Sequence, residues 1–221
     1  MADVQAIIDA AISRSAAAQP HLLTIDAPEL LRVVQRVLSR LYLLAARRRA
    51  VNFGQLATVT YTAGNPGGWP FPSDALVVLR VELGDGTEVA VTRLDDRAGM
   101  QPMPSVYELG RVLVTCGAAT DPTNGDTLSV FYAAAAPTLA TVATPLPAAF
   151  PEMFYPLLEL AVAQYCARKD ARVEDLASFQ GEESEWAAYF DAWLTDASIA
   201  PGDRFAGFRP AQVSAASNDG S

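Results

Sequence analysis

Few side chains in this sequence have the type and spacing that catalysis or metal binding requires. His21 is the only histidine, and no cysteine lies beside it. A Ser/His/Asp arrangement would have to use this residue, and neither a GxSxG turn nor an HExxH helix occurs. A CxxC pair and a phosphate-binding glycine loop are also absent from the sequence. We therefore expect no catalytic residue, no metal ligand set and no cofactor.

Two acidic segments are the nearest approach to a metal or acid–base site. Asp95 and Asp96 are paired carboxylates, which can bind a metal or transfer protons. Because they are adjacent and lie between Arg93 and Arg97, we interpret them as a solvated ion-pair cluster on a loop. Residues 121–126, DPTNGD, resemble a calcium loop but lack its remaining spaced oxygen ligands and its terminal glutamate. This segment is predicted to be a turn.

The two cysteines, Cys116 and Cys166, have apolar neighbours. Cysteines in such surroundings are typically buried, reduced thiols. A disulfide between them is the alternative, which the sequence does not decide.

Composition and charge restrict the class of protein. The chain has 221 residues, about half of them apolar, which suits one domain with a sizeable core. Its formal net charge is −9, so it is not expected to grip nucleic acid through the phosphates. No basic, apolar signal sequence precedes Asp9, and no stretch has the roughly 18 apolar residues of a membrane span. We expect a protein made in the cytoplasm, with no membrane association.

The first fifty residues predict two helices. Residues 2–18 have apolar side chains on one side. Around Asp26, the residue types predict a helix start: Asp26 as the cap, Pro28 in the first turn and Glu29 at the capping-box position. Apolar residues then recur at spacings of three and four over about five turns.

Arginines follow the opposite face of this second helix, at positions 32, 36 and 40. Arg47, Arg48 and Arg49 end it, where cations oppose the negative end of the helix dipole. A nucleic-acid contact by the triplet is the alternative interpretation.

From residue 55 the period changes from 3.6 to 2, which predicts strands. They are expected at 55–61, 76–83, 87–93, 111–115 and 128–132, with a hairpin turn at Gly84-Asp85-Gly86. The loop at 65–72 carries Trp69 and Phe71. These aromatics suit either a lid over the core or a contact with another subunit, and both readings stay open. An extended Ala/Thr segment follows at 133–144.

Residues 145–194 predict two helices that close the core with apolar and aromatic side chains. Pro147 or Pro151 can open the first of them. Pro156 either lies within its opening turn or kinks it one turn in. The buried stripe expected of the second helix consists of Trp186, Tyr189, Phe190, Trp193 and Leu194.

After Ala200 the composition shifts to residues with no helical or strand period. Arg204, Phe205, Phe208 and Arg209 are residue types that anchor interfaces. This tail either remains free or docks into a partner and orders as it binds.

These elements define an α+β fold, with a bundle of about four helices, an inserted antiparallel β subdomain and a flexible C-terminal tail. The expected units are residues 1–50 (N-terminal helices), 51–144 (β subdomain), 145–199 (C-terminal helices packing on the N-terminal ones) and 200–221 (extended arm).

The order of elements resembles the head-to-tail connector (adaptor) proteins of tailed bacteriophages and gene transfer agents. The resemblance spans most of the chain and is one of layout. It rests on the segment APELLR at 27–32, on the β segments LVVLRV at 76–81 and VTRLDDR at 91–97, and on TPLPAAFP at 144–151 before the helix at 157–165. The helix ending at Trp193 and Leu194 fits as well. The β insertion is larger than in minimal connectors.

The resemblance implies a structural virion protein of the head–tail neck. It implies a homo-oligomeric ring, usually of twelve copies, that docks on the portal protein, meets a downstream neck or tail protein and extends the DNA channel. DNA would pass through without sequence-specific binding, and by analogy the C-terminal tail would be the arm that reaches the portal. Another tail-completion or baseplate component is the alternative, and a small enzyme is a further one.

Overall fold

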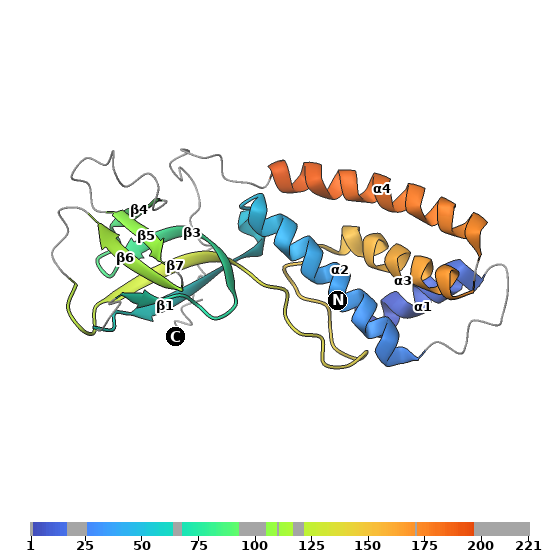
Figure 1. Ribbon diagram of the computed structural model, residues 1–221, viewed down its shortest axis with the longest axis horizontal. Coiled ribbons are helices and arrows are strands. Elements are labelled where there is room, and N and C mark those ends of the chain that lie inside the picture. The colour runs from blue at the N-terminus through green and yellow to red at the C-terminus, as the bar shows by residue number, and fades with distance from the viewer. Residues whose placement is uncertain are drawn as a thin grey trace, which may run out of the picture.

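The computed structural model describes residues 2–16, 26–63, 68–92, 105–109, 111–116, 122–170 and 172–196. Over these ranges the chain forms a helical lobe and a sheet lobe that lie end to end (Figure 1). The helices come from both ends of the described chain, and the strands come from its middle. The predicted α+β class, a helical bundle interrupted by a β insertion, is confirmed.

Four α-helices build the helical lobe. They are α1 (Val4–Ala16), α2 (Ala27–Arg47), α3 (Tyr155–Lys169) and α4 (Val173–Asp196). The third helix is central because it packs against each of the other three. The N-terminal and C-terminal helices thus share one apolar core, which includes Ile7, Leu38, Leu158 and Phe190.

The start of α2 differs from the expected capping box. Asp26 occupies the N-cap position and Pro28 lies in the first turn, but the Asp26 side chain makes no capping hydrogen bond. The backbone N–H groups of Glu29 and Leu30 instead donate to the Asp26 carbonyl oxygen, at 2.9 and 3.2 Å. The Glu29 carboxylate is used elsewhere, because it accepts from the Tyr165 hydroxyl.

The helix α3 begins later than the prolines at 147 and 151 suggested. Pro151 precedes a short 3-10 turn, η4 (Glu152–Phe154), and α3 starts at Tyr155. Pro156 therefore lies in the opening turn, which is the first of its two predicted positions, and its missing N–H costs no helical hydrogen bond there. The helix α4 is longer than its aromatic segment alone, since it begins at Val173.

Seven strands form the sheet lobe. They are β1 (Gly54–Thr60), β2 (Trp69–Pro70), β3 (Ala75–Leu83), β4 (Glu88–Thr92), β5 (Ser105–Leu109), β6 (Val112–Cys116) and β7 (Thr127–Ala134). Their order in the sheet is β1-β7-β3-β4-β5-β6-β2. All neighbours are antiparallel except β4 and β5, which are parallel.

The sheet curls so that its two end strands approach each other. A β-bridge joins Thr62, just after β1, to Gly68, just before β2. A side chain could not replace the hydrogen of Gly68, because a Cβ atom there would lie 2.6 Å from the carbonyl oxygen of Leu113. The interior of this curled sheet is filled by a separate apolar cluster that includes Val81, Leu128 and Val130.

The connection from β7 to α3 belongs to the helical lobe. Leu139, Leu146 and Phe150 are buried in the helical core, and the Leu139 N–H donates to Gln35 Oε1 of α2 at 2.7 Å. The β insertion therefore ends at Ala134, ten residues before the boundary expected at 144.

Candidate functional site

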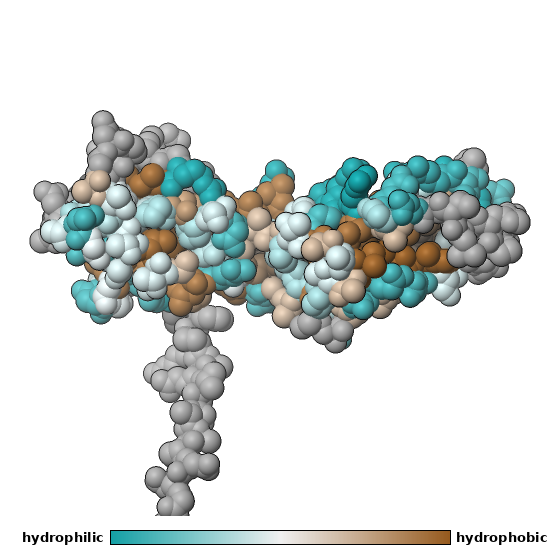
Figure 2. Space-filling view, turned by 90° about the horizontal axis from the view of Figure 1, so that it is seen from below, coloured by the Kyte–Doolittle hydropathy of each residue, from teal (hydrophilic) through white to brown (hydrophobic). Residues whose placement is uncertain are grey.

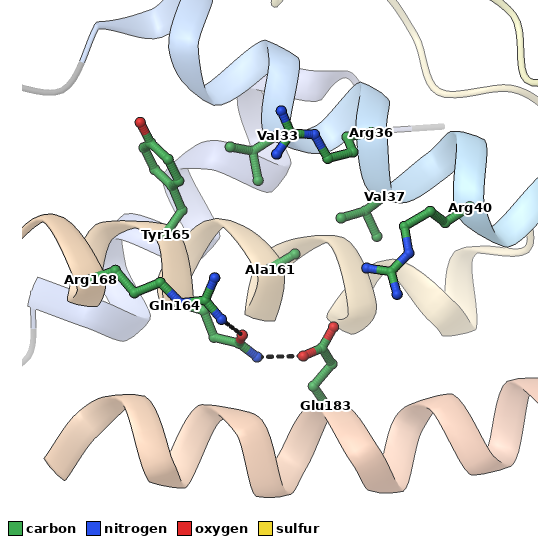
Figure 3. Close-up of a pocket in the computed structure, with 9 residues that line it drawn as sticks. All are labelled: Val33, Arg36, Val37, Arg40, Ala161, Gln164, Tyr165, Arg168 and Glu183. Carbon is green, nitrogen blue, oxygen red and sulfur yellow. Dashed lines mark hydrogen bonds between the residues drawn. The ribbon is translucent and has the colours of Figure 1, made fainter. Parts of the chain in front are cut away.

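A cleft lies between α2 and α4, with α3 as its floor, and all of its lining residues belong to the part of the chain that the structure describes (Figure 3). Its volume is about 190 Å³. The lining residues are Val33, Arg36, Val37, Arg40, Ala161, Gln164, Tyr165, Arg168 and Glu183. The cleft is therefore lined by both apolar and polar side chains.

Arginines dominate the charge of this cleft. Arg36 and Arg40 are exposed on α2, and neither has an ion-pair partner among the described residues. The spacing of four residues places both on one side of the helix. Arg40 and Glu183 point into the space between α2 and α4 from opposite sides (Figure 3), and no ion pair joins them.

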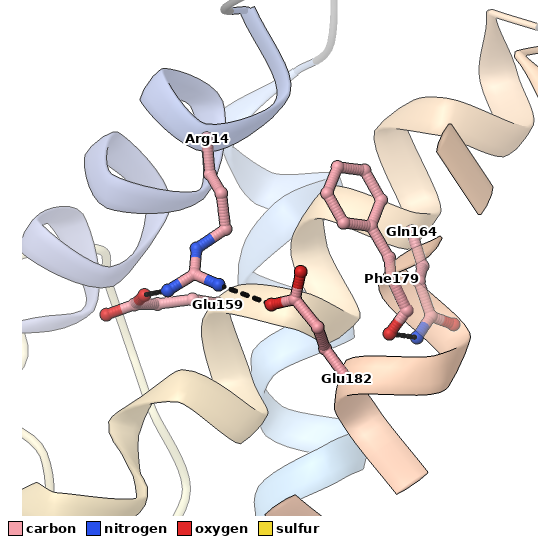
Figure 4. Close-up of polar contacts among 5 residues, drawn as sticks. All are labelled: Arg14, Glu159, Gln164, Phe179 and Glu182. Atoms are coloured by element: carbon pink, nitrogen blue, oxygen red, sulfur yellow. Dashed lines mark hydrogen bonds and ion pairs between the residues drawn. The ribbon is translucent and has the colours of Figure 1, made fainter. Parts of the chain in front are cut away.

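Gln164 fixes the floor of the cleft. It is one of the few buried polar side chains, at 5% exposed. Its Nε2 donates to Glu183 Oε2 at 2.6 Å and to the Phe179 carbonyl oxygen at 3.3 Å (Figures 3 and 4). Because a buried amide without partners costs free energy, these bonds lock α4 to α3 in one register.

A second polar group lies at the rim, where α2 meets α3. Glu29 accepts hydrogen bonds from the Tyr165 hydroxyl and, at 2.9 Å, from Lys169 Nζ. The pKa of Glu29 is lowered from its ordinary value, chiefly by the Tyr165 hydrogen bond and next by the hydrogen bond from Lys169. The same contacts raise the pKa of Tyr165 and of Lys169, in both cases chiefly through Glu29. These three side chains satisfy one another and are not poised as a general acid or base.

The chemistry that this cleft offers is recognition of an anion. Guanidinium groups bind carboxylates through paired N–H donors. Val33, Val37 and Ala161 provide apolar contact for the carbon stem of such a group. No cysteine, serine or histidine is among the lining residues that the structure describes, so the site has no evident nucleophile.

The two walls belong to helices of opposite charge. The helix α2 has one acidic residue, Glu29, and four arginines, whereas α4 has no basic residue. The acidic residues of α4 are Glu174, Asp175, Glu182, Glu183, Glu185, Asp191 and Asp196.

Several acidic residues of α4 hold the bundle together. Arg14 of α1 donates to Glu182 of α4 at 2.9 Å and contacts Glu159 of α3 at 3.5 Å (Figure 4). Arg48 pairs with Asp191. Glu174, Glu185 and Asp196 are exposed and have no ion-pair partner within the described ranges.

The arginine triplet at the end of α2 joins the two lobes. Arg49 has a left-handed backbone (φ 55°), and its Nη2 donates to the carbonyl oxygens of Val78 and Leu79 in β3, at 3.3 and 3.5 Å. Arg48 reaches α4 instead. Two of the three arginines are thus engaged within the chain, which disfavours the nucleic-acid interpretation of the triplet.

The loop aromatics predicted as a lid or subunit contact are placed in the sheet lobe. Trp69 is 2% exposed, and its Nε1 donates to the Asp126 carbonyl oxygen at 3.2 Å. This burial favours the predicted lid over the core for Trp69, because its indole fills the interior of the curled sheet. Phe71 is partly buried, with the Arg111 guanidinium 5.3 Å from its ring centre.

Only some of the other predicted groups lie within the residues that the structure describes. The described part of the DPTNGD segment, residues 122–126, forms a turn: the Thr123 N–H donates to Asp126 Oδ2 at 2.7 Å, and Gly125 has a φ of 107°. Cys166 is a free, buried thiol in α3. His21, Asp95 and Asp96, and the tail anchors Arg204, Phe205, Phe208 and Arg209, lie outside the described residues.

Reasoning from the sequence missed Gln164 and Glu183. The available signal was a glutamine within the apolar stripe of α3, next to Tyr165 and one turn from Ala161 and Arg168.

In Figure 2, hydrophilic residues (teal) cover much of the face that is seen, and a band of hydrophobic residues (brown) runs along part of the helical lobe.

The described residues include no group of three or more His, Cys, Asp or Glu side chains arranged to hold a metal ion. Among these residues, no helix combines the length and apolar character that crossing a bilayer requires.

Comparison with known proteins adds no identification: no protein-family profile matches the chain, and no curated protein is significantly similar to it.

Proposed function

We propose that the protein is a structural virion component, a head-to-tail connector (adaptor) of a tailed bacteriophage or gene transfer agent. It docks as a ring on the portal and extends the DNA channel towards the tail. A connector acts through shape and contact, and this proposal assigns the chain no catalytic activity.

One observation carries the proposal. The chain leaves a helical bundle after α2, builds a sheet lobe and returns to complete the same bundle with α3 and α4. That layout is the one on which the resemblance to connectors rests.

Two further features support it. The exposed arginines of α2 and the exposed carboxylates of α4 have no ion-pair partners within the described part of the chain, as expected of surfaces that meet other subunits. The net charge of −9 suits the wall of a channel, because an acidic surface does not retain DNA phosphates.

The test is co-expression with a portal protein encoded beside this chain, followed by purification through a tag on the portal. We expect the chain to remain on the portal ring. Deleting residues 201–221 should abolish this retention if Arg204, Phe205, Phe208 and Arg209 anchor the arm. The matched control deletes only 211–221 and should retain binding, because it leaves those four residues in place.

Absence of the full-length chain from the purified portal would contradict the connector function. Undiminished retention of the 201–221 deletion would refute the arm while leaving the connector function intact. A location elsewhere in the tail would favour the tail-completion or baseplate alternative.

A further inference from the structure

The outer face of α4 contains a glycine that the chain itself does not explain. Gly181 lies in the middle of the helix, where glycine is about 1 kcal/mol less favourable than alanine. A Cβ atom at this position would meet no atom within 4 Å. Neither packing nor backbone geometry within the described chain therefore requires a residue without a side chain at position 181.

The same face has acidic groups at regular intervals. Glu174, Glu185 and Asp196 are eleven residues apart, and eleven residues are about three turns, so they form one row along the helix. Gly181 lies between the first two. Small exposed residues lie around Gly181 and further along this face, which we call the acidic α4 face: Ala177, Ser178, Ala188 and Ala192. The larger Tyr189 side chain, 65% exposed, lies on the same side one turn after Glu185.

Small residues along a helix allow another helix to approach closely, and charges at its ends then select the partner. The acidic α4 face therefore fits a basic helix. Its own chain provides no such partner within the described ranges, because the buried side of α4 packs on α3 through Phe179, Phe190 and Leu194.

The chain carries one helix face of matching chemistry. Arg36, Arg40 and Arg47 are exposed on α2, on the side opposite its buried stripe, with Leu43 (42% exposed) between them. We call this the arginine α2 face. Arg36 and Arg47 are also eleven residues apart, so both rows repeat at about 16 Å.

We propose that the acidic α4 face of one copy packs on the arginine α2 face of a second copy. Arg36 and Arg47 then pair with Glu174 and Glu185, and Leu43 lies against Gly181 and the small residues between these two carboxylates. Because the two faces differ, a pair of copies keeps one free face of each kind. Such a heterologous contact repeats from copy to copy and closes into a ring when the rotation allows. This inference rests on the proposed function for its ring and names the contact that builds it.

The test uses two complementary charge reversals. In the first variant, Arg36→Glu/Arg47→Glu, both faces are acidic. In the second, Glu174→Arg/Glu185→Arg, the carboxylates on either side of Gly181 are reversed, so both faces are basic. Sedimentation velocity at low ionic strength measures self-association of each variant alone, of their equimolar mixture and of the wild type. We expect the wild type and the mixture to associate, and each variant alone to associate at least tenfold more weakly.

Two further sets of variants distinguish the loss of this specific contact from the effects of a changed net charge or of unfolding. Arg36→Gln/Arg47→Gln and Thr58→Glu/Thr60→Glu each change the net charge by −2, the second pair on exposed positions of β1. Only the first pair should weaken association. Gly181→Phe should block association and Gln180→Phe should not, because the exposed Gln180 lies about 100° round the helix from Gly181. Circular dichroism checks that every variant is folded.

The proposal is overturned if neither the wild type nor the mixture associates, or if the charge reversals or Gly181→Phe leave association unchanged. It is also overturned if Arg36→Gln/Arg47→Gln abolishes portal binding while self-association persists, because the arginine α2 face would then serve the portal. If the wild type binds the portal but does not self-associate, this contact is refuted and the connector function stands. Intact self-association without any portal binding contradicts that function and leaves this contact standing.

Discussion

Arg48 and Asp191 form a two-point ion pair that joins the end of α2 to α4. Arg48 Nε donates to Oδ1 at 2.9 Å, and Nη2 donates to Oδ2 at 2.7 Å. The pair therefore links the second and the last helices of the bundle next to the junction with the sheet lobe.

The strength of this pair is limited by solvent. The Arg48 and Asp191 side chains are 46% and 38% exposed, so water screens their attraction, although the two-point geometry favours it. A double-mutant cycle with Arg48→Ala and Asp191→Ala should give a coupling free energy of about 0.5–1 kcal/mol in urea unfolding. A coupling indistinguishable from zero would show that the pair does not hold the helices together.

The aromatic cluster at the centre of the bundle should contribute far more. Phe190 is fully buried and lies edge-on to Phe154, with 4.9 Å between their ring centres. Replacing it by alanine removes these contacts and leaves a cavity, at a cost of about 3–5 kcal/mol. Chemical denaturation of Phe190→Ala measures this loss of stability.

The neighbouring residue in the sequence provides the control. Tyr189 is 65% exposed, and Tyr189→Ala should change the free energy of unfolding by no more than about 0.5 kcal/mol. Similar effects of the two substitutions would contradict the orientation of α4.

These residues show how much of the fold could be predicted from the sequence. The aromatic period of α4 predicted the burial of Phe190 and Leu194 but was wrong for Tyr189, which is 65% exposed. Strand patterns predicted β1, β3, β4, β6 and β7, because such signals are local. Two strands were missed, β2 with only two residues and β5 beside a predicted loop, because pairing to distant segments creates them. Trp69 is the clearest case: a loop composition surrounds it, yet the curled sheet closes over its ring.

Less of the candidate site than of the fold could be predicted from the sequence. Periodicity separated Arg36 and Arg40 from the buried stripe of α2, which placed them on an outer face. It did not show that Glu183, about 145 residues later, lies across a cleft from them, because that proximity depends on how α2 and α4 both pack on α3.

The Cys166 thiol should be inert in the native protein. It is 1% exposed, and burial, followed by the nearby Asp170 charge, raises its pKa from 9.0 to about 11. In a Cys116→Ser background, a thiol reagent near neutral pH should label Cys166 only as fast as the protein unfolds. Since the folded pKa is raised, this group stabilises the fold below pH 9.0, and the contribution is lost as the pH rises towards about 11. Rapid labelling of the folded protein would show that α3 is not packed as described.

The group formed by Glu29, Tyr165 and Lys169 should make stability depend on pH in the acid range. The pKa of Glu29 is lowered from 4.5 by the Tyr165 hydrogen bond and by Lys169. Its contribution is present above pH 4.5 and is lost as the pH falls through the lower folded value. The difference in urea midpoint between the wild type and Glu29→Gln should therefore shrink as the solution is acidified.

Tyr165→Phe is the matched variant for this experiment, because it removes the hydrogen bond that shifts Glu29 most. It should reduce the pH dependence without abolishing it, since Lys169 remains. A midpoint difference that stays constant on acidification would contradict the contact.

The most direct test of the connector function is a cryo-electron microscopy reconstruction of the neck of the particle that carries this protein. We predict density for a ring of these two-lobed chains directly beneath the portal, coaxial with the DNA channel. Particles in which the chain is absent from the neck, or occupies a baseplate or another part of the tail, would contradict the proposal.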